Sequence, residues 1–288
     1  MGAASLGGRY ASVEACGQRR MPLDVGGRLG YFRSDDDHLG RPGPGRPAPR
    51  GPAPMTSLDD LVVRARSLVR DGHRALLGVT GGPGAGKTTL AEHLVHLLRS
   101  APPEGLPERE WVAYVPMDGF HLADVELDRL GRRDRKGAPD TFDAAGYAAL
   151  LRRLREDEDD VIYAPAFERD LEQPIAGSIP IPRAARLVVT EGNYLLLDRG
   201  DWARVRAGLH EVWYCDLDPG ERVRRLVSRH ERFGKDHDAA VAWAMGTDQR
   251  NADLIATTRP RADLVVPDAV LRSIGDHETA DGRTGHAG

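Results

Sequence analysis

The sequence predicts an α/β fold in which a doubly wound parallel sheet has helices on both faces. Short apolar segments alternate with segments of helical periodicity from about residue 58 to about residue 266, the pattern of a sheet built from strand–helix units. Residues 186–190 are apolar through their middle, as expected of a strand buried on both faces. No internal repeat is evident in the sequence.

The expected elements follow one another in chain order. Apolar residues at helical spacing predict a lead-in helix over residues 58–69. The pattern then predicts a strand over 75–80, a helix over 87–99, a strand over 111–116, a charged loop over 119–141 and a helix over 144–155. Beyond an acidic turn it predicts a strand over 161–164, a small hairpin over 175–181, strands over 186–190 and 211–216, helices over 219–231 and 238–257, and a last strand over 262–266.

The two ends of the chain differ from this central part. Glycine and proline fill 18 of the first 54 positions, and such a segment cannot offset its ordering entropy by burying apolar surface. We therefore expect a disordered extension over 1–54, a folded domain over 55–271 and a disordered, glycine-rich tail over 272–288. Translation that begins at Met55 would fit the same division.

Composition excludes several classes of function. The 40 Lys and Arg against 44 Asp and Glu give a net charge of −4, which argues against a broad nucleic-acid surface. No apolar run approaches the ~18 residues of a membrane span. Two cysteines, Cys16 and Cys215, cannot form a disulfide framework, so a reducing, cytoplasmic setting is expected.

Residues 81–88 read GGPGAGKT and fit the phosphate-binding pattern G-x-x-x-x-G-K-[ST]. An apolar strand precedes the motif and an amphipathic helix follows it, so its backbone N–H groups and the helix N-terminus can surround phosphate oxygens. The alternative is a tight turn that merely needs glycine. Lys87 would reach the β- and γ-phosphates, the Thr88 hydroxyl would ligate Mg²⁺, and Thr89 would support the helix start. The candidate phosphate-binding residues are Gly81, Gly82, Pro83, Gly84, Ala85, Gly86, Lys87, Thr88 and Thr89.

Two carboxylates stand at the ends of predicted strands. Glu191 follows the buried strand over 186–190 and is the candidate for positioning Mg²⁺, with a solvated strand-end acid as the alternative. Asp216 and Asp218 compete for this role, but they suit a turn and a helix N-cap before Pro219 better. Asp118, in the segment PMDGFH after the second strand, would face the cleft and accept a proton from an attacking hydroxyl. An ordinary strand-to-loop aspartate is the alternative for Asp118.

Five segments together carry a resemblance to a known family: GGPGAGKTT, PMDGFH, RKGAPDTFD (residues 135–143), YAPAFERD (residues 163–170) and TEGNYLLL (residues 190–197). The chain resembles the superfamily of uridine kinase, pantothenate kinase and phosphoribulokinase. Within it, the chain is similar to bacterial nucleoside/nucleotide kinase-like proteins, some labelled fructose transport system kinases. The resemblance covers about residues 75–266 and implies a P-loop NTPase fold with a helical lid, ATP, Mg²⁺, a hydroxyl acceptor and Asp118 as the catalytic base. It departs from uridine kinases, which usually carry Asp-x-Phe-Tyr where this chain has Asp-Gly-Phe-His, so it leaves the acceptor open.

Polar and aromatic residues around the cleft are candidates for binding the acceptor. Arg135 and Lys136 form a basic pair that could hold an anionic substrate or the transferred phosphoryl group, or they could belong to a solvated charged loop. Tyr163, Phe167 and Arg169 suit a polar organic substrate, although Phe167 could equally belong to the core. His121 could hydrogen-bond to the substrate or lie on the surface.

The helix over 219–231 is the candidate lid, because kinases of this superfamily close an arginine-bearing lid over the phosphates. Arg225 and Arg229 are four residues apart and share a helix face, but they could also belong to a solvated helix. Gly234 would serve as the hinge. Asp248 and Asn251 would either line the cleft or make internal contacts.

Two functions remain open at this point. The first is an ATP-dependent kinase acting on a small-molecule hydroxyl: a nucleoside, a pantothenate-like compound or a sugar. The second is an ATP-hydrolysing, nucleotide-binding regulatory protein. The acceptor-side carboxylate Asp118 favours the kinase. Neither nucleic acid nor a membrane is expected as a partner, and the resemblance allows a homodimer.

Overall fold

The computed structural model describes residues 57–70, 72–106 and 110–281, with side chains up to residue 274. The extension expected over residues 1–54 lies outside the described residues, and so do residues 282–288 of the expected tail. Within the described part of the chain, no helix is long and apolar enough to cross a lipid bilayer.

A five-stranded parallel sheet forms the centre of the fold, in the strand order β2-β5-β1-β6-β7. Its strands are β1 (Ala75–Thr80), β2 (Val112–Pro116), β5 (Leu187–Glu191), β6 (Glu211–Asp216) and β7 (Leu264–Pro267). Every residue of β1 and β5 is buried, as expected of inner strands covered on both faces. The strand order reverses at β1, and the carboxyl ends of the strands at such a point form the usual ligand-binding crevice.

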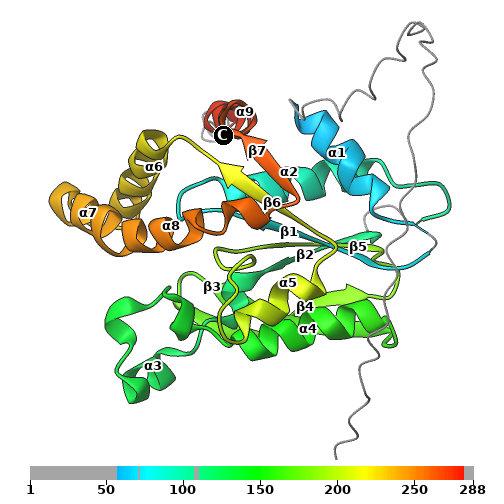
Figure 1. Ribbon diagram of the computed structural model, residues 1–288, viewed down its shortest axis with the longest axis horizontal. Coiled ribbons are helices and arrows are strands. Elements are labelled where there is room, and N and C mark those ends of the chain that lie inside the picture. Colours follow the sequence, from blue (N-terminus) through cyan, green and yellow to red (C-terminus); the bar gives the residue numbers. More distant parts are fainter. Residues whose placement is uncertain (1–56, 71, 107–109, 282–288) are drawn as a thin grey trace, which may run out of the picture. The chain divides into compact units, whose positions relative to one another are not determined.

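Helices cover both faces of this sheet (Figure 1), which confirms the predicted fold class. One face carries α1 (Leu58–Ser67), α2 (Lys87–Ser100) and α9 (Asp268–Asp281), and the other carries α4 (Ala144–Glu156) and α5 (Trp202–Gly208). Two apolar clusters fill the layers because successive side chains of a strand point to opposite faces. Leu77 packs in the cluster under α2, and Leu76 packs in the cluster under α4.

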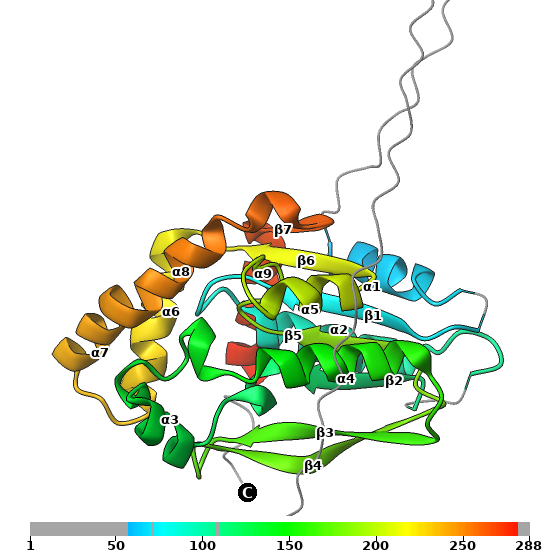
Figure 2. The same ribbon diagram turned by 60° about the horizontal axis from the view of Figure 1, so that its bottom comes forward.

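A separate two-stranded antiparallel sheet lies beside α4 (Figure 2). It consists of β3 (Val161–Glu168) and β4 (Gln173–Pro182). The predicted hairpin over 175–181 was therefore wrong: this segment is one strand, and its partner is the whole of β3. The pairing shifts register between Ala164 and Ala166, where Pro165 has no N–H to donate to the ladder.

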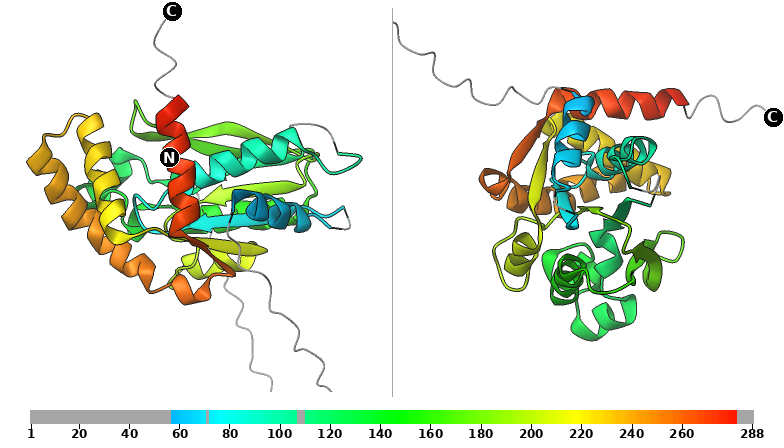
Figure 3. Two further views of the ribbon diagram at one scale, coloured as in Figure 1. Left: turned by 90° about the horizontal axis from the view of Figure 1, so that it is seen from above. Right: turned by 90° about the vertical axis from the view of Figure 1, so that its right-hand side faces the viewer.

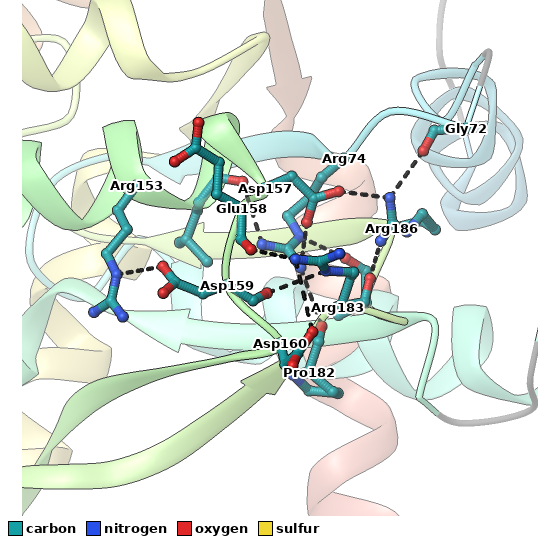
Figure 4. Close-up of polar contacts among 12 residues, drawn as sticks. Gly72, Arg74, Arg153, Asp157, Glu158, Asp159, Asp160, Pro182, Arg183 and Arg186 are labelled. Atoms are coloured by element: carbon teal, nitrogen blue, oxygen red, sulfur yellow. Dashed lines mark hydrogen bonds and ion pairs between the residues drawn. The ribbon is translucent and has the colours of Figure 1, made fainter.

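A buried arginine holds the end of the β3–β4 hairpin against the central five-stranded sheet (Figure 4). Arg74 stands just before β1, and its side chain donates to the carbonyl oxygens of Ala185 (2.7 Å) and Pro182 (3.1 Å). It also forms an ion pair with Asp157, the C-cap of α4, with 2.9 Å between Nη2 and Oδ1. The starts of β1 and β5 and the ends of α4 and β4 are thereby joined at one buried charge.

Helices after β6 form an arm that projects beyond the sheet (Figure 3). The arm consists of α6 (Pro219–Arg232), α7 (His237–Trp243), a five-residue π-helical turn (Ala244–Asp248) and α8 (Gln249–Ala256). Asp218 caps α6 by accepting from the Glu221 N–H, as its position before Pro219 predicts. The helix predicted over 238–257 is thus continuous in outline, with one π turn at its centre.

Three helices depart from the sequence expectations. The charged loop predicted over 119–141 contains α3 (Asp124–Leu130), a seven-residue helix with only one buried side chain, Leu127, and hence little periodicity. Helix α5 was not predicted. Helix α9 runs to Asp281 and buries Leu271 and Ile274, so the disordered tail expected from residue 272 does not begin there.

The contact between Gly119 and β3 can be tested by adding one methyl group. A Cβ on Gly119 would stand 2.2 Å from the carbonyl oxygen of Pro165, so Gly119→Ala must push the hairpin away from the segment after β2. We expect a loss of roughly 1–3 kcal/mol in unfolding free energy, measured by urea denaturation. The control is Gly246→Ala, because a Cβ there meets nothing within 4 Å. Equal stability of the two variants would contradict this packing.

Candidate active site

The glycine-rich loop connects β1 to α2, as the sequence predicts. Gly84 and Gly86 adopt φ angles of 79° and 83°, which side chains other than glycine rarely allow. A Cβ on Gly84 would also lie 2.7 Å from Cγ of Leu226 in α6. No side chain caps the N-terminus of α2, where Gly86 is the N-cap. The first N–H groups of α2 therefore have no capping side chain to bond, and they are available to an anion.

Lys87 is held inside this loop. Its ammonium donates to the carbonyl oxygen of Gly82 at 3.1 Å, and its residue is 8% exposed. Burial lowers the pKa of Lys87, against the opposing pull of Glu191. The lysine is thus positioned before any phosphate arrives.

Asp118 and Glu191 lie at the ends of neighbouring strands. Pro116 of β2 stands opposite Glu191 of β5, and Asp118 follows in the 3-10 turn Met117–Phe120. Glu191 accepts hydrogen bonds from Thr88 and from the Tyr114 hydroxyl, the latter at 3.3 Å. Burial, and then the negative charge of Asp118, raise the pKa of Glu191 to about 7. Two carboxylates and one lysine therefore share a site largely shielded from water.

A cavity of about 520 Å³ opens over these groups. The predicted site residues that line it are Pro83, Gly84, Lys87, Thr88, Asp118, His121, Lys136, Phe167, Arg169, Glu191 and Arg229. Asp248 and Asn251 line it as well, and both also make internal contacts, with His230 and with the backbone oxygen of Gly137. The cavity lies between the glycine-rich loop, the helical arm and the end of β3.

His121 joins the carboxylates to an aromatic wall. Its Nδ1 lies 2.8 Å from the backbone oxygen of Asp118. Its ring packs against Phe142 and Phe167, with centroids 4.0 and 4.8 Å away. Burial lowers the pKa of His121, although Asp118 opposes the shift. Because a carbonyl oxygen only accepts, Nδ1 is the donor in the contact with Asp118.

The two arginines predicted for the lid are placed differently. Arg229 lines the cavity. Arg225 forms an ion pair with Glu221, with 2.8 Å between Nε and Oε1, and its Nη1 would stand 3.4 Å from a Cβ on Gly86. Arg225 therefore lies beside the phosphate loop, outside the cavity lining.

Two predicted substrate residues are not brought to the cavity. Arg135 forms an ion pair with Asp140 at 2.7 Å. Tyr163 is 60% exposed on β3, whose neighbouring residues Ile162 and Ala164 are buried, so strand alternation turns Tyr163 to solvent. Thr89 lies in the first turn of α2 and does not line the cavity either.

Sequence reasoning missed several lining residues of the helical arm. Lys235 lies 4.8 Å from the ring centroid of Trp243, and His230 hydrogen-bonds to Asp248 at 2.8 Å. These four residues line the cavity, and among them only Asp248 was a candidate from the sequence. The sequence offered one signal for these residues, the rarity of lysine. It holds only three lysines, and one of the other two lies in the phosphate loop, so Lys235 could have been singled out as a candidate. The π turn between α7 and α8 determines which of their side chains face the cavity. The helical periodicity of the sequence does not reveal such a turn.

Comparisons with known proteins agree with this arrangement. No protein-family model matches the chain. A provisionally named uridine kinase of Schizosaccharomyces pombe is 33% identical over 225 residues, which are 76% of this chain and 92% of that protein. A provisionally named fructose transport system kinase from Silicibacter has a solved structure with 37% identity and a TM-score of 0.65, covering 73% of this chain and 99% of that one. The P-loop protein YFH7 of Saccharomyces cerevisiae, at 20% identity and a TM-score of 0.60, shares the fold.

The matches extend over about three quarters of this chain. The match covers almost the whole length of the uridine kinase-like relative and of the Silicibacter protein. ATP use follows from relatives named as ATP-dependent kinases. The chain belongs to the P-loop kinase superfamily that contains the uridine and pantothenate kinases, and it is a phosphotransferase with a hydroxyl group as acceptor.

Proposed function

We propose that this kinase transfers the γ-phosphoryl group of ATP to a hydroxyl of a small molecule bound beside Asp118, and that Asp118 takes up the hydroxyl proton. The observation that carries the proposal is that Lys87, Asp118 and Glu191 line one cavity from three separate elements: α2, the segment after β2, and β5. Phosphoryl transfer requires mainly positioning and charge stabilisation, and this arrangement offers both.

The phosphates of ATP would bind at the glycine-rich loop. Lys87 supplies a buried positive charge there, and the uncapped start of α2 supplies N–H groups. Arg229 of α6 reaches the same cavity and would neutralise charge that develops on the transferred group. Leu226 packs against Gly84, so a movement of α6 would also displace the glycine-rich loop.

Thr88 and Glu191 fit a magnesium ion that arrives with ATP. Within the described residues, no group of three or more His, Cys, Asp and Glu side chains is placed to hold a metal alone. Mg²⁺ is commonly bound by one or two protein oxygens together with substrate phosphates. Burial and, after it, the negative charge of Asp118 raise the pKa of Glu191, and a bound cation would stabilise its charged form. When bound, Mg²⁺ would screen the phosphate charges.

Asp118 would act on the acceptor. Its carboxylate lines the cavity next to His121, whose Nδ1 contacts the Asp118 backbone oxygen. A hydroxyl placed between Asp118 and the γ-phosphate could lose its proton as it attacks phosphorus. A nucleotide-dependent regulator needs no such acceptor-side base, so the position of Asp118 favours the kinase. Nucleosides, pantothenate-like compounds and sugars remain the candidate acceptors.

The role of Asp118 can be tested by replacing its carboxylate with an amide. Asp118→Asn should leave ATP affinity nearly unchanged, because the phosphate loop is untouched. Turnover at a saturating acceptor should fall by about 10²–10⁴-fold, the usual contribution of a general base. Asp134→Asn is the matched control, since Asp134 is exposed and does not line the cavity. Titration calorimetry with ATP and a coupled ADP assay measure the two quantities. Wild-type turnover in Asp118→Asn would remove Asp118 from catalysis.

The strained charge of Glu191 predicts a pH-dependent stability. A folded-state pKa near 7, above the ordinary 4.5, means that charging Glu191 costs free energy in the ligand-free protein. The protonated carboxyl of Glu191 therefore favours the folded state. This contribution to the unfolding free energy is complete below about pH 4.5 and is lost as the pH rises through about 7. Relative to Glu191→Gln, the wild type should lose about 3 kcal/mol of unfolding free energy across this window. Urea unfolding of both proteins at several pH values measures the difference, and parallel profiles would contradict it.

A further inference from the structure

The cavity has an end that the phosphates would not fill. In-line transfer places the acceptor on the side of the γ-phosphate opposite the leaving group. If Asp118 receives the hydroxyl proton, the rest of the acceptor extends past Asp118 toward His121, Lys136, Phe167 and Arg169, which we call the acceptor end. The inference below rests on the proposed function and concerns what this end binds.

Charged side chains of both signs surround the acceptor end. The cations Arg133, Lys136 and Arg169 line the cavity, and so do the carboxylates of Glu172 and Asp118. Lys136 is 18% exposed and lies 2.8 Å from Asp124. The same Asp124 carboxylate also pairs with Arg133 at 2.9 Å. One sheltered carboxylate is thus shared by two cations. Lys136 also donates to the backbone oxygen of Glu172 at 2.5 Å. The other carboxylates near this pair are Asp128, 3.3 Å from Arg133, and Glu172, 3.9 Å from Lys136, and both are largely exposed.

Arg169 adds a third cation, and the carboxylates nearest to it in the sequence are Glu168, Asp170 and Glu172. Within the described ranges, no carboxylate forms an ion pair with Arg169, although its side chain lines the cavity. It follows Phe167 by two residues at the end of β3, and the Phe167 ring centroid lies 5.3 Å from Nζ of Lys136. An aromatic surface flanked by two cations is suited to a small molecule that has both an apolar body and a negative group.

The triphosphate does not account for these charges. The phosphate loop has its own cation in Lys87, the uncapped start of α2, and Arg229 from the arm. Arg169 and Lys136 come from other elements, the turn after β3 and the loop after α3. We propose that the phosphate acceptor of this kinase carries an anionic group, a carboxylate or a phosphate, in addition to its reacting hydroxyl, and that Arg169 and Lys136 bind this group.

The test does not require the acceptor to be known. Small molecules from a bacterial extract are separated on an anion-exchange resin at neutral pH, and each fraction is incubated with the full-length kinase and γ-³²P-ATP. Labelled product is expected with the bound, anionic fraction and not with the flow-through. Alkaline phosphatase treatment of the fraction, followed by removal of the phosphatase, then distinguishes the two sources. Loss of acceptor activity identifies a phosphate group, and survival identifies a carboxylate.

Variants connect the result to the named residues. Arg169→Gln should raise the half-saturating concentration of the anionic fraction by about 10–100-fold, the effect of losing a hydrogen bond to a charged group. The KM for ATP should stay unchanged. Lys136→Gln should act in the same direction. Arg129→Gln is the matched control, because Arg129 lies on α3 in the same segment, is 69% exposed and does not line the cavity.

The outcomes separate this inference from the proposed function. Labelled product formed only with the flow-through fraction would overturn the anionic acceptor and leave the kinase intact. Identical behaviour of Arg169→Gln and Arg129→Gln would overturn the assignment of Arg169. If no fraction yields labelled product while ATP is hydrolysed, the proposed transfer to a small-molecule hydroxyl fails, and this inference fails with it.

Discussion

The placement of three charged side chains in one poorly hydrated site is the constraint on which the rest of the structure depends. Lys87, Asp118 and Glu191 come from separate parts of the chain, and parallel pairing of β5 with β1 and β2 brings them together. Burying charged groups is costly, and burial is the main cause of the lowered pKa of Lys87 and the raised pKa of Glu191. Binding of nucleotide and magnesium would relieve this electrostatic strain, which couples stability to ligand binding.

Backbone contacts hold this cluster in place from several sides. Gly119 lets the carbonyl of Pro165 approach the segment that carries Asp118, and Gly84 lets α6 approach the phosphate loop. Arg74 fixes the far end of the β3–β4 hairpin through three carbonyl oxygens and Asp157. The acceptor end at β3 and the phosphate end at α6 are thereby both positioned against the same central sheet.

Local pattern and motif were sufficient for the parallel sheet and the phosphate loop. Residues 75–80 were predicted as a strand and form β1, because a short apolar run before a glycine-rich turn allows few alternatives. The motifs also located Asp118 and Glu191, whose environment the structure describes. What sequence could not supply was side-chain direction in charged segments. Arg135 and Lys136 are adjacent, yet only Lys136 lines the cavity, since Asp140 holds Arg135 elsewhere.

The central claim is that the buried positive charge of Lys87 makes this cavity a phosphoryl-transfer site. Lys87→Met keeps the aliphatic stem and removes the charge, so single-turnover transfer of labelled phosphate from ATP, in the presence of the acceptor fraction, measures that charge directly. Our account predicts a fall on the order of 10²-fold or more in a variant whose far-ultraviolet circular dichroism matches the wild type. A folded Lys87→Met protein with wild-type transfer would contradict the account.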